Sequence, residues 1–530
     1  MVPEAAPSKE PSAAPPEGRS AWVVPVVLVL VTVVFYWRYQ FRSFGFYRDA
    51  GIYLSGALGL AAGEGYRLVP FSGQPVIGVY PPLQSLLLSP FVRLGGASLP
   101  EMVPWVNGGM ILLAVAAVLA GWRVMVRLGS PAWLAGLLAL NLALAMRWFE
   151  WTFWLMSDIG FTALLLLLAG RVLARPDDRG DRWLWLVVGL GLATAYLWRV
   201  AAFGALAATA LLAVWAGWRR GNWTPVLAFC GPCLLAGLGW WLLSRQAIGY
   251  GNIYPVIIQQ AGGGLAGYSR LVLGQFGELL SGRALWEAMI VPLSRLPIAL
   301  GRASPAAAWL VSAAGFVLAA GVAVTAVLGL RRARRERELA LAFVALAYLA
   351  FVMVIPNGAD HVHRYLFPVL PLLLGLSVRW LGGVLPARWR RPAAIAVTVA
   401  LLGTAAANAA MTVRASNFAS RQYALDELKE VADWTRAHTP PEALVAVDYT
   451  LPFVHFHLWS GRKLVTDTDH PGVAGSHIRT DLMGEARAAP YTLMSDQGFA
   501  PYRPAGGFEE VKVSRNGHFR LLRRLEGGAR

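Results

Sequence analysis

An acidic residue and a proline-rich turn near the start of the chain have the side chains that proton transfer requires. Asp49 stands just past the first long apolar run and precedes a helical pattern that ends near Glu64, and Tyr80-Pro81-Pro82-Leu83 follows. A carboxylate held in place can act as a general base and take a proton from an acceptor hydroxyl. Aspartate is also a common helix N-cap. The two roles are compatible, because a capped carboxylate is also a positioned one.

Two short helices are predicted around these residues. Leu54, Ala57, Leu58 and Ala61 fall on one face of the first helix, a pattern typical of a helix that lies on a membrane surface. The second helix, Leu83 to Leu94, starts after two prolines that fix its direction of entry. In the alternative interpretation the prolines form a rigid turn and nothing more.

The composition places both helices beside a membrane. The chain has 530 residues, of which 56% are hydrophobic and 15% charged, and its mean hydropathy is +0.51. Ordinary soluble domains carry about 25% charged residues. The apolar residues cluster in long runs, so the predicted fold class is a polytopic α-helical membrane protein. A net charge of +17 would indicate nucleic-acid binding in a soluble protein. Much of the arginine, however, lies in short loops between apolar runs, where it sets topology, so we expect no nucleic-acid partner.

We predict about eleven transmembrane helices from the apolar runs of membrane length. They cover residues 21–37, 103–122, 131–147, 159–174, 183–198, 200–217, 224–243, 306–330, 339–355, 364–381 and 392–412. Residues 1–20 are rich in proline, alanine and glutamate and are predicted to form a disordered tail. No small-residue cleavage site follows the first run, which indicates an uncleaved signal anchor.

The arginine content of the connections predicts the orientation of the spans. Arginine-rich connections lie near residues 123–127, 171–182, 219–220, 331–337 and 388–391 and alternate with connections poorer in arginine. The positive-inside rule makes the arginine-rich set cytoplasmic. The N-terminal tail is then cytoplasmic, and residues 21–412 form the transmembrane domain. The first outer loop (38–102), the second large outer loop (244–305) and residues 413–530 are then extracytoplasmic.

Residues 413–530 have the composition of a soluble domain, because long apolar runs disappear there. Gln422 to His438 predicts an amphipathic helix and Ala443 to Val447 a strand. Glu509 to Ser514 and His518 to Leu522 flank Arg515-Asn516-Gly517, and Asn-Gly between strand-like runs indicates a β-hairpin. We therefore predict a small C-terminal α/β domain outside the membrane.

Taken together, these segments resemble a known family of membrane enzymes. An aspartate just after the first span, a helix ending in a Gly-x-Gly-Tyr turn and Tyr-Pro-Pro-Leu are similar to the first outer loop of the GT-C superfamily. The resemblance continues at Met156-Ser157-Asp158, at Leu197-Trp198-Arg199 and at the segment from His363 to Pro371. It covers roughly residues 20–470. GT-C enzymes are membrane glycosyltransferases that use polyprenyl-phosphate sugars, and the nearest branch resembles the protein mannosyltransferases and lipid A aminoarabinose transferases.

The resemblance implies a fold, a reaction and a set of site residues. The fold is GT-C-like. The acceptor hydroxyl attacks the anomeric carbon of the donor sugar and polyprenyl phosphate leaves, with a carboxylate as base and cations on the phosphate. The implied residues are Asp49 and Asp158 for catalysis; Arg364, Arg199, His363 and His361 for the donor phosphate; and Tyr80, Glu64 and Tyr365 for the acceptor and donor pocket.

The sequence also departs from the family pattern, and several residues have simpler interpretations. Many relatives carry two adjacent acids in the first loop, whereas Ala50 follows Asp49 here. Some relatives hold a divalent metal near these acids. Asp158 or Glu150 would be the one available partner for a metal here, so we assign no metal ligand, and a divalent metal stays an open alternative. His361-x-His363 is too small a set for metal binding. As for simpler roles, Asp158 can be a helix start, Arg199 can extend to the membrane interface, and Arg364 can be a span-end anchor.

Two other classes of protein compete with the glycosyltransferase. A lipid or saccharide transporter or flippase predicts ionisable residues within spans and internal repeats. An O-antigen-ligase-type enzyme would keep its important residues in the loop at 244–305 and would not need Asp49. In the leading interpretation the partners are a polyprenyl-phosphate sugar and a glycolipid, protein or polysaccharide acceptor. The alanine- and arginine-rich composition indicates a GC-rich bacterium, and hence the inner (cell) membrane.

Overall fold

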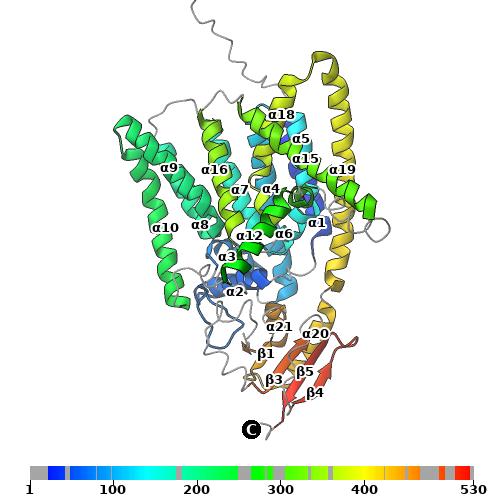
Figure 1. Ribbon diagram of the computed structural model, residues 1–530. Coiled ribbons are helices and arrows are strands. Elements are labelled where there is room, and N and C mark those ends of the chain that lie inside the picture. Colours follow the sequence, from blue (N-terminus) through cyan, green and yellow to red (C-terminus); the bar gives the residue numbers. More distant parts are fainter. Residues whose placement is uncertain are drawn as a thin grey trace, which may run out of the picture.

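The computed structural model is a long helical bundle with a small β-sheet at one end (Figure 1). It describes residues 22–41, 48–78, 80–96, 98–174, 182–248, 264–280, 283–289, 305–331, 336–355, 362–422, 424–447, 452–465, 489–495 and 508–525. His361 lies outside these residues, as does the predicted tail at 1–20.

The first half of the chain forms the helices that surround the predicted site. They are α1 (Val23–Tyr39), α2 (Arg48–Ala62), α3 (Leu83–Gly95), α4 (Leu99–Arg127), α5 (Ala132–Leu144), α6 (Met146–Phe153), α7 (Ser157–Ala174), α8 (Arg182–Trp198), the 3-10 turn η1 (Val200–Ala202), α9 (Phe203–Arg220) and α10 (Thr224–Ile248).

The second half completes the bundle and adds the sheet. Its helices are α12 (Gly264–Leu280), α13 (Arg283–Met289), α15 (Pro305–Arg331), α16 (Glu336–Val354), α17 (Val362–Leu366), α18 (Leu370–Val384), α19 (Ala387–Gln422), α20 (Leu425–His438) and α21 (Phe453–Ser460). Its strands are β1 (Val445–Val447), β2 (Leu464–Val465), β3 (Tyr491–Ser495), β4 (Phe508–Val513) and β5 (Phe519–Arg524).

Six of the described helices are long and apolar enough to cross a membrane, or seven if α5 and α6, bent by 54° at their junction, form one span. Four more apolar helices are shorter: Val23–Tyr39, Arg182–Trp198, Ala319–Arg331 and Leu370–Val384. Several apolar helices of span length are therefore present, and the total of about eleven spans remains a prediction.

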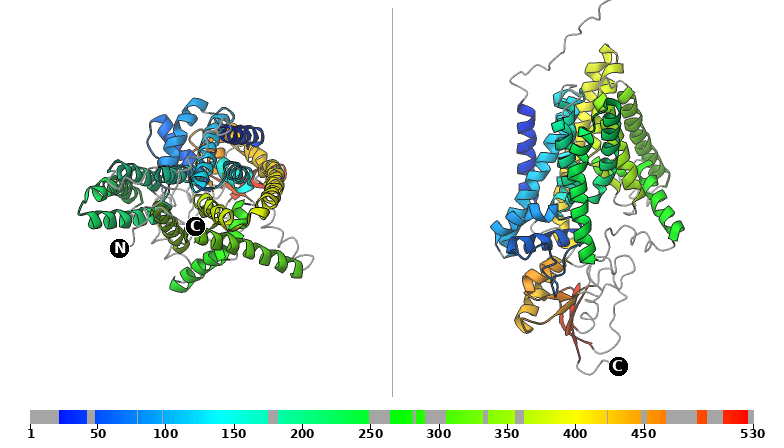
Figure 2. Two further views of the ribbon diagram at one scale, coloured as in Figure 1. Left: turned by 90° about the horizontal axis from the view of Figure 1, so that it is seen from above. Right: turned by 90° about the vertical axis from the view of Figure 1, so that its left-hand side faces the viewer.

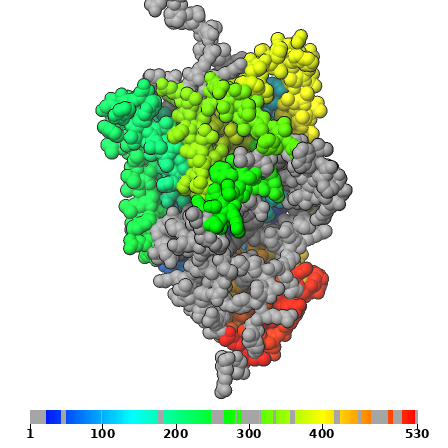
Figure 3. Space-filling view, viewed as in Figure 1, coloured from blue at the N-terminus to red at the C-terminus, as the bar shows by residue number. Residues whose placement is uncertain are grey.

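The burial of these helices separates a central group from an outer one. In α4 and α7, 56% of the most apolar window is buried, against 11% in α10 and α19. Large apolar side chains on α10, such as Leu227, Leu234 and Leu235, are exposed. Figure 3 shows α10 and α19 at opposite margins of one face of the molecule. Exposed leucines on outer helices are what a lipid environment requires, because lipid tails are as apolar as the side chains.

The two short helices α2 and α3 cross the end of the bundle instead of running along it (Figure 2). The sequence places both helices correctly, but α2 is not a free surface helix. Ile52, Leu54 and Ala57 are buried, because α3 covers one side of α2 and α21 packs on it as well. The first outer loop is therefore part of the packed core at this end.

The C-terminal segment forms a five-stranded sheet in the order β2-β1-β3-β5-β4. The pairs β1–β2 and β1–β3 are parallel, and β3–β5 and β4–β5 are antiparallel. The hairpin predicted around Asn516-Gly517 is confirmed, with Gly517 at φ 78°, a left-handed backbone conformation that favours glycine. Helix α19 continues to Gln422, so the predicted boundary at 412–413 falls inside a helix.

The sheet is joined to the first outer loop. Phe71 pairs with Leu464 of β2, the Ser72 amide donates to the Leu464 carbonyl (2.8 Å), and the Leu464 amide donates to the Pro70 carbonyl (2.8 Å). The loop therefore extends the edge of the sheet, which protects that edge from pairing elsewhere. The α9–α10 and α18–α19 turns, which belong to the arginine-rich set, lie at the opposite end of the bundle (Figure 1).

Candidate active site

Asp49 lies in the first turn of α2 and is held by a tyrosine from the proline-rich turn. The Tyr80 hydroxyl donates to Asp49 Oδ1 at 2.8 Å. Tyr80 is positioned in turn by Tyr66, whose hydroxyl donates to the Tyr80 carbonyl at 3.0 Å. The structure therefore brings together two of the predicted site residues, and it orients the carboxylate by a charge-assisted hydrogen bond.

Asp158 begins α7 and forms an ion pair with Arg199, which stands between α8 and η1. The side chains of Asp158 and Arg199 are 3% and 12% exposed, so the pair is buried. Arg199 Nη1 also donates to the Ser157 hydroxyl at 3.4 Å. Each side chain therefore has a buried partner of opposite charge, in addition to the position of Asp158 at the start of α7.

Arg364, on the short helix α17, is stacked among aromatic rings. Its guanidinium carbon lies 5.5 Å from the Trp151 ring centre and 5.0 Å from that of Tyr365, and Nη2 donates to the Tyr365 hydroxyl at 3.0 Å. The residue is 8% exposed. Within the described part of the chain no carboxylate pairs with Arg364, and its Nε has no hydrogen-bond partner there. Arg364 is therefore a buried cation with a donor available for an anion.

These groups form one cluster, which we call the charged cluster: Asp49, Asp158, Arg199 and Arg364. The Tyr365 ring lies 5.3 Å from Arg199 and links it to Arg364. The charges of Asp49, Asp158 and Arg199 all act on Arg364.

Tyr53 lies between the Asp49–Tyr80 pair and the Asp158–Arg199 pair of the charged cluster. Its ring contacts that of Tyr80, with 5.5 Å between centres, and its hydroxyl lies 3.0 Å from the Ser157 hydroxyl. Burial raises the pKa of the Tyr53 phenol, and the Asp49 charge raises it further. Tyr53 therefore stays neutral, and the path Tyr80–Tyr53–Ser157 runs from Asp49 to Arg199.

His363 faces a second ionic network. The Trp151 indole N–H donates to His363 Nε2 at 3.1 Å, and because an indole can only donate, the proton of the neutral ring is on Nδ1. That nitrogen lies 3.6 Å from Glu287 on α13, and Glu287 also pairs with Arg147. His363 therefore supports Trp151, against which Arg364 stacks.

Glu64 does not join the other predicted residues. It follows the C-terminal end of α2, whereas Asp49 is near the start, and a helix of this length spans roughly 20 Å. Glu64 is exposed and lies near Lys463, on which its charge acts. The structure does not place Glu64 with the other predicted pocket residues. Helix α2 runs away from Asp49, and Glu64 follows its far end.

The described residues do not assemble a metal site. No group of three or more histidine, cysteine, aspartate or glutamate side chains suited to a metal ion occurs among them. The carboxylate of Asp158 is engaged by Arg199, and a second cation at that place would be repelled. The charged cluster therefore supplies its positive charge from arginine, and no step below depends on a metal.

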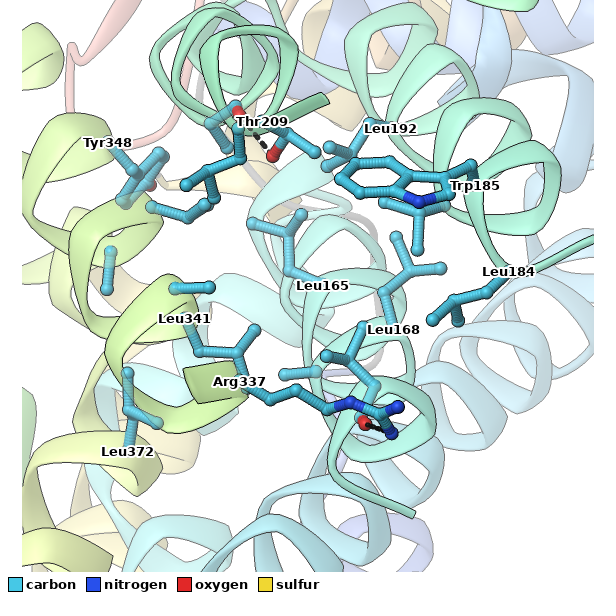
Figure 4. Close-up of a pocket in the computed structure, with 18 of the residues that line it drawn as sticks. Leu165, Leu168, Leu184, Trp185, Leu192, Thr209, Arg337, Leu341, Tyr348 and Leu372 are labelled. Carbon is cyan, nitrogen blue, oxygen red and sulfur yellow. Dashed lines mark hydrogen bonds between the residues drawn. The ribbon is translucent and has the colours of Figure 1, made fainter. Parts of the chain in front are cut away.

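An apolar cavity of about 280 Å³ lies beside the charged cluster, between α7, α8, α9, α16 and α18. Figure 4 shows Tyr348 and Arg337 at different levels of α16 and leucines such as Leu165 and Leu168 between them. Tyr348 is near the charged cluster, since the charges of Arg199 and Arg364 both act on it. The cavity therefore leads away from the arginines along the bundle.

Comparison with solved structures identifies the fold. ArnT from Cupriavidus metallidurans, in a crystal structure bound to undecaprenyl phosphate, matches with a TM-score of 0.59 at 15% identity, over 97% of this chain and 100% of that one. The archaeal oligosaccharyltransferase AglB from Archaeoglobus fulgidus, in complex with an inhibitory peptide and a dolichol-phosphate, matches with a TM-score of 0.52 at 12% identity. That match covers 90% of this chain and 69% of the other.

Sequence comparison adds nothing to this result, because no protein-family profile and no curated protein sequence matches the chain. Both solved structures are GT-C glycosyltransferases, so the chain has the GT-C fold. The resemblance read from the sequence is confirmed at the level of the fold.

Proposed function

We propose that this protein is a glycosyltransferase that moves a sugar from a polyprenyl-phosphate donor to an acceptor hydroxyl on the extracytoplasmic side. One observation carries the proposal. Arg364 is a buried cation with no carboxylate partner in the described part of the chain, and it lies in the same cluster as a carboxylate held in place by Tyr80. A positive site for an anion next to an oriented base is the arrangement that this transfer requires.

In the proposed reaction Asp49 takes the proton of the acceptor hydroxyl. The hydroxyl oxygen forms the new bond to the anomeric carbon, and the bond from that carbon to the phosphate oxygen breaks. The electron pair of the broken bond stays on the phosphate, which leaves as polyprenyl phosphate. A positioned general base contributes about 10²- to 10⁴-fold to such a step.

The two arginines have different proposed roles at the phosphate. Arg199 is largely neutralised by Asp158, whereas Arg364 keeps its charge. Arg364 is therefore assigned to the phosphate oxygens, where a planar guanidinium can donate two hydrogen bonds at once. The Tyr365 hydroxyl holds Arg364 in orientation by accepting from it, and Arg199 contributes its remaining positive potential as charge develops on the leaving group.

The apolar cavity is assigned to the first part of the donor's hydrocarbon chain. It starts near Tyr348, beside the arginines, and its lining is mostly leucine, valine and alanine. Burying the chain there removes apolar surface from contact with polar groups while the phosphate stays at Arg364. The undecaprenyl phosphate bound by the similar ArnT structure supports a donor of this class.

A transfer assay tests the proposed function. Membranes containing the protein are incubated with a panel of radiolabelled polyprenyl-phosphate sugars, and label is followed into lipid, protein and polysaccharide fractions. We expect label from one sugar class to enter one fraction, and membranes lacking the protein to give none. Movement of intact donor across the membrane without transfer would contradict the proposal and favour the transporter.

A further inference from the structure

Gln84 is a fully buried amide in the first turn of α3, next to the proline-rich turn. Its Oε1 accepts a hydrogen bond from the Trp198 indole at 2.7 Å. Its Nε2 donates to the Leu155 carbonyl at 3.2 Å. Nε2 also lies 3.4 Å from Met110 Sδ of α4. A buried amide that bonds the Trp198 indole and the Leu155 carbonyl is costly to remove, because both groups are then left without this bond.

Leu155, whose carbonyl accepts from Gln84, has an unusual backbone conformation just before Asp158. Its φ is 52°, in the left-handed region, which is uncommon for residues other than glycine. Leu155 stands in the break between α6 and α7, so this conformation sets the direction in which α7 starts. The bond from Gln84 to its carbonyl stabilises a conformation that costs energy by itself.

Trp198, whose indole donates to Gln84, immediately precedes Arg199. Its ring lies directly against Gly160, where an added Cβ would overlap the indole. Gly160 is in the first turn of α7, two residues after Asp158. The indole is therefore fixed between Gln84 and the turn that carries Asp158, and Arg199 follows from that fixed point.

We infer that Gln84 is a positioning residue that aligns Asp158 with Arg199 and, through the Tyr365 ring that both arginines contact, aligns Arg364. One amide contacts the segment before Asp158 and the residue before Arg199, so it sets the relative position of both members of the ion pair. The inference rests on the proposed function for its catalytic consequence. Gln84 touches none of the reacting atoms and acts through the two segments that it joins.

The test compares Gln84→Met, which keeps the length of the side chain and removes its hydrogen bonds to Trp198, Leu155 and Met110, with a matched control. Asn141→Leu also removes a buried amide, one that bonds the Leu401 carbonyl and Thr404 between α5 and α19, away from the charged cluster. We expect Gln84→Met to lower kcat/KM for the donor by on the order of 100-fold, because a small misplacement of binding groups has effects of this size. The KM for the acceptor should not change. The control should lose stability and keep its KM for the donor.

A second-site change separates positioning from general damage. Glycine adopts the left-handed conformation without strain, so Leu155→Gly in the Gln84→Met background should recover part of the donor kcat/KM. The double variant Gln84→Met with Trp198→Phe should lose less than the sum of the two single losses, since both changes remove the bond between Gln84 and Trp198.

A chemical readout tests Gln84 without sugar transfer. Phenylglyoxal modifies accessible arginine, and the fraction of modified Arg199 is measured by mass spectrometry of its peptide. Arg199 should be modified several-fold faster in Gln84→Met and at the original rate in Asn141→Leu. If the unaltered protein transfers no sugar, the proposed function is wrong. The rates of Arg199 modification in Gln84→Met and Asn141→Leu still test the role of Gln84 in that case. Equal Arg199 rates in both variants, or equal loss of donor kcat/KM in both, would overturn the inference.

Discussion

At the scale of residues, the site is organised by the unequal partners of two arginines. Arg199 is paired with Asp158, and Arg364 is held by rings and a hydroxyl instead of a carboxylate. A buried ion pair has little attraction left for a ligand, whereas a cation stacked on aromatic rings keeps its charge. This difference assigns the donor phosphate to Arg364 and a supporting role to Arg199.

The hydrogen bond from Tyr80 to Asp49 leads to a prediction about the base. Tyr80→Phe keeps the ring contact with Tyr53 and removes the hydroxyl that orients the carboxylate. We expect kcat for sugar transfer to fall by about 10-fold, since a hydrogen bond to a charged group contributes about 1.5–3 kcal/mol. Steady-state kinetics with saturating donor measures it. Tyr36→Phe is the control, because it removes another buried tyrosine bond, to the Ala143 carbonyl, that does not involve Asp49; similar losses in both variants would argue against an orienting role.

The sequence identifies the charged residues better than it identifies their supports. Asp49, Tyr80 and Arg364 are recognisable because charge and proline stand out against an apolar background. Gln84 and Leu155 give no such signal, since one is an ordinary polar residue and the unusual φ of the other exists only in the folded chain. Glu64 was assigned to the pocket from the resemblance to the first outer loop of the family, and the direction of α2 moves it away.

At the scale of elements, helix α2 is held from two sides. The Ser85 hydroxyl of α3 donates to the Tyr53 carbonyl at 2.8 Å, and the Phe453 ring of α21 lies against Gly51. Gly51 is needed for this close approach, because a Cβ there would stand 2.8 Å from the ring. The C-terminal segment therefore packs within two residues of Asp49.

This packing predicts that Gly51→Ala is harmful. The added methyl group would push Phe453 or α2 from its place, and overpacking of this kind costs about 1–3 kcal/mol. We expect a lower thermal midpoint and reduced transfer, measured on the purified protein in detergent. Gly237→Ala, also within a helix, meets nothing within 4 Å and should not lower the midpoint. Equal midpoints for the two variants would show that α21 does not press on α2.

The ends of helices and strands could be predicted where a clear sequence signal marks them, and not elsewhere. The hairpin at Asn516-Gly517 follows from its turn chemistry. The continuation of α19 to Gln422 was missed because the apolar run ends well before the helix does. The break between α5 and α6 was missed because both helices are apolar and no proline or glycine marks the junction.

At the scale of the whole molecule, the charged cluster, the crossing helices and the sheet gather at one end of the bundle. The α9–α10 and α18–α19 turns lie at the other end (Figure 1), which agrees with the alternation read from the sequence. The extracytoplasmic location of the sheet remains a prediction, and its contact with the first outer loop through Leu464 ties it to the same side as Asp49.

The stability of the C-terminal segment is predicted to depend on pH through His455. Burial lowers the pKa of His455 to about 4 from 6.5. Between these values the unfolded form is protonated and the folded form is not, so stability is greatest above pH 6.5 and falls as the pH drops toward 4. The loss amounts to about 3 kcal/mol. Hydrogen exchange of the α21 amides, followed as a function of pH, measures this loss of stability.

His455→Phe is expected to remove most of this pH dependence. His438→Phe, at an exposed position of α20, is the matched control and should retain it. If the stability of His455→Phe still changes with pH between 4 and 6.5 as steeply as that of the unaltered protein, the effect comes from other groups. Glu427 acts at the acidic end of this window: burial raises its pKa, but the bonds from Ser514 and Asn516 outweigh burial and lower it below 4.5, so its contribution is complete above pH 4.5 and is lost as the pH falls further.

The most direct test of the account is the transfer rate of Asp49→Asn. The change keeps the shape of the side chain and removes the basic oxygen, so single-turnover transfer should fall by about 10²- to 10⁴-fold. Binding of the polyprenyl-phosphate donor should stay within a few-fold of the unaltered protein, because Arg364 and Arg199 remain. Transfer at nearly the original rate would contradict Asp49 as the base, and with it the mechanism proposed for the charged cluster.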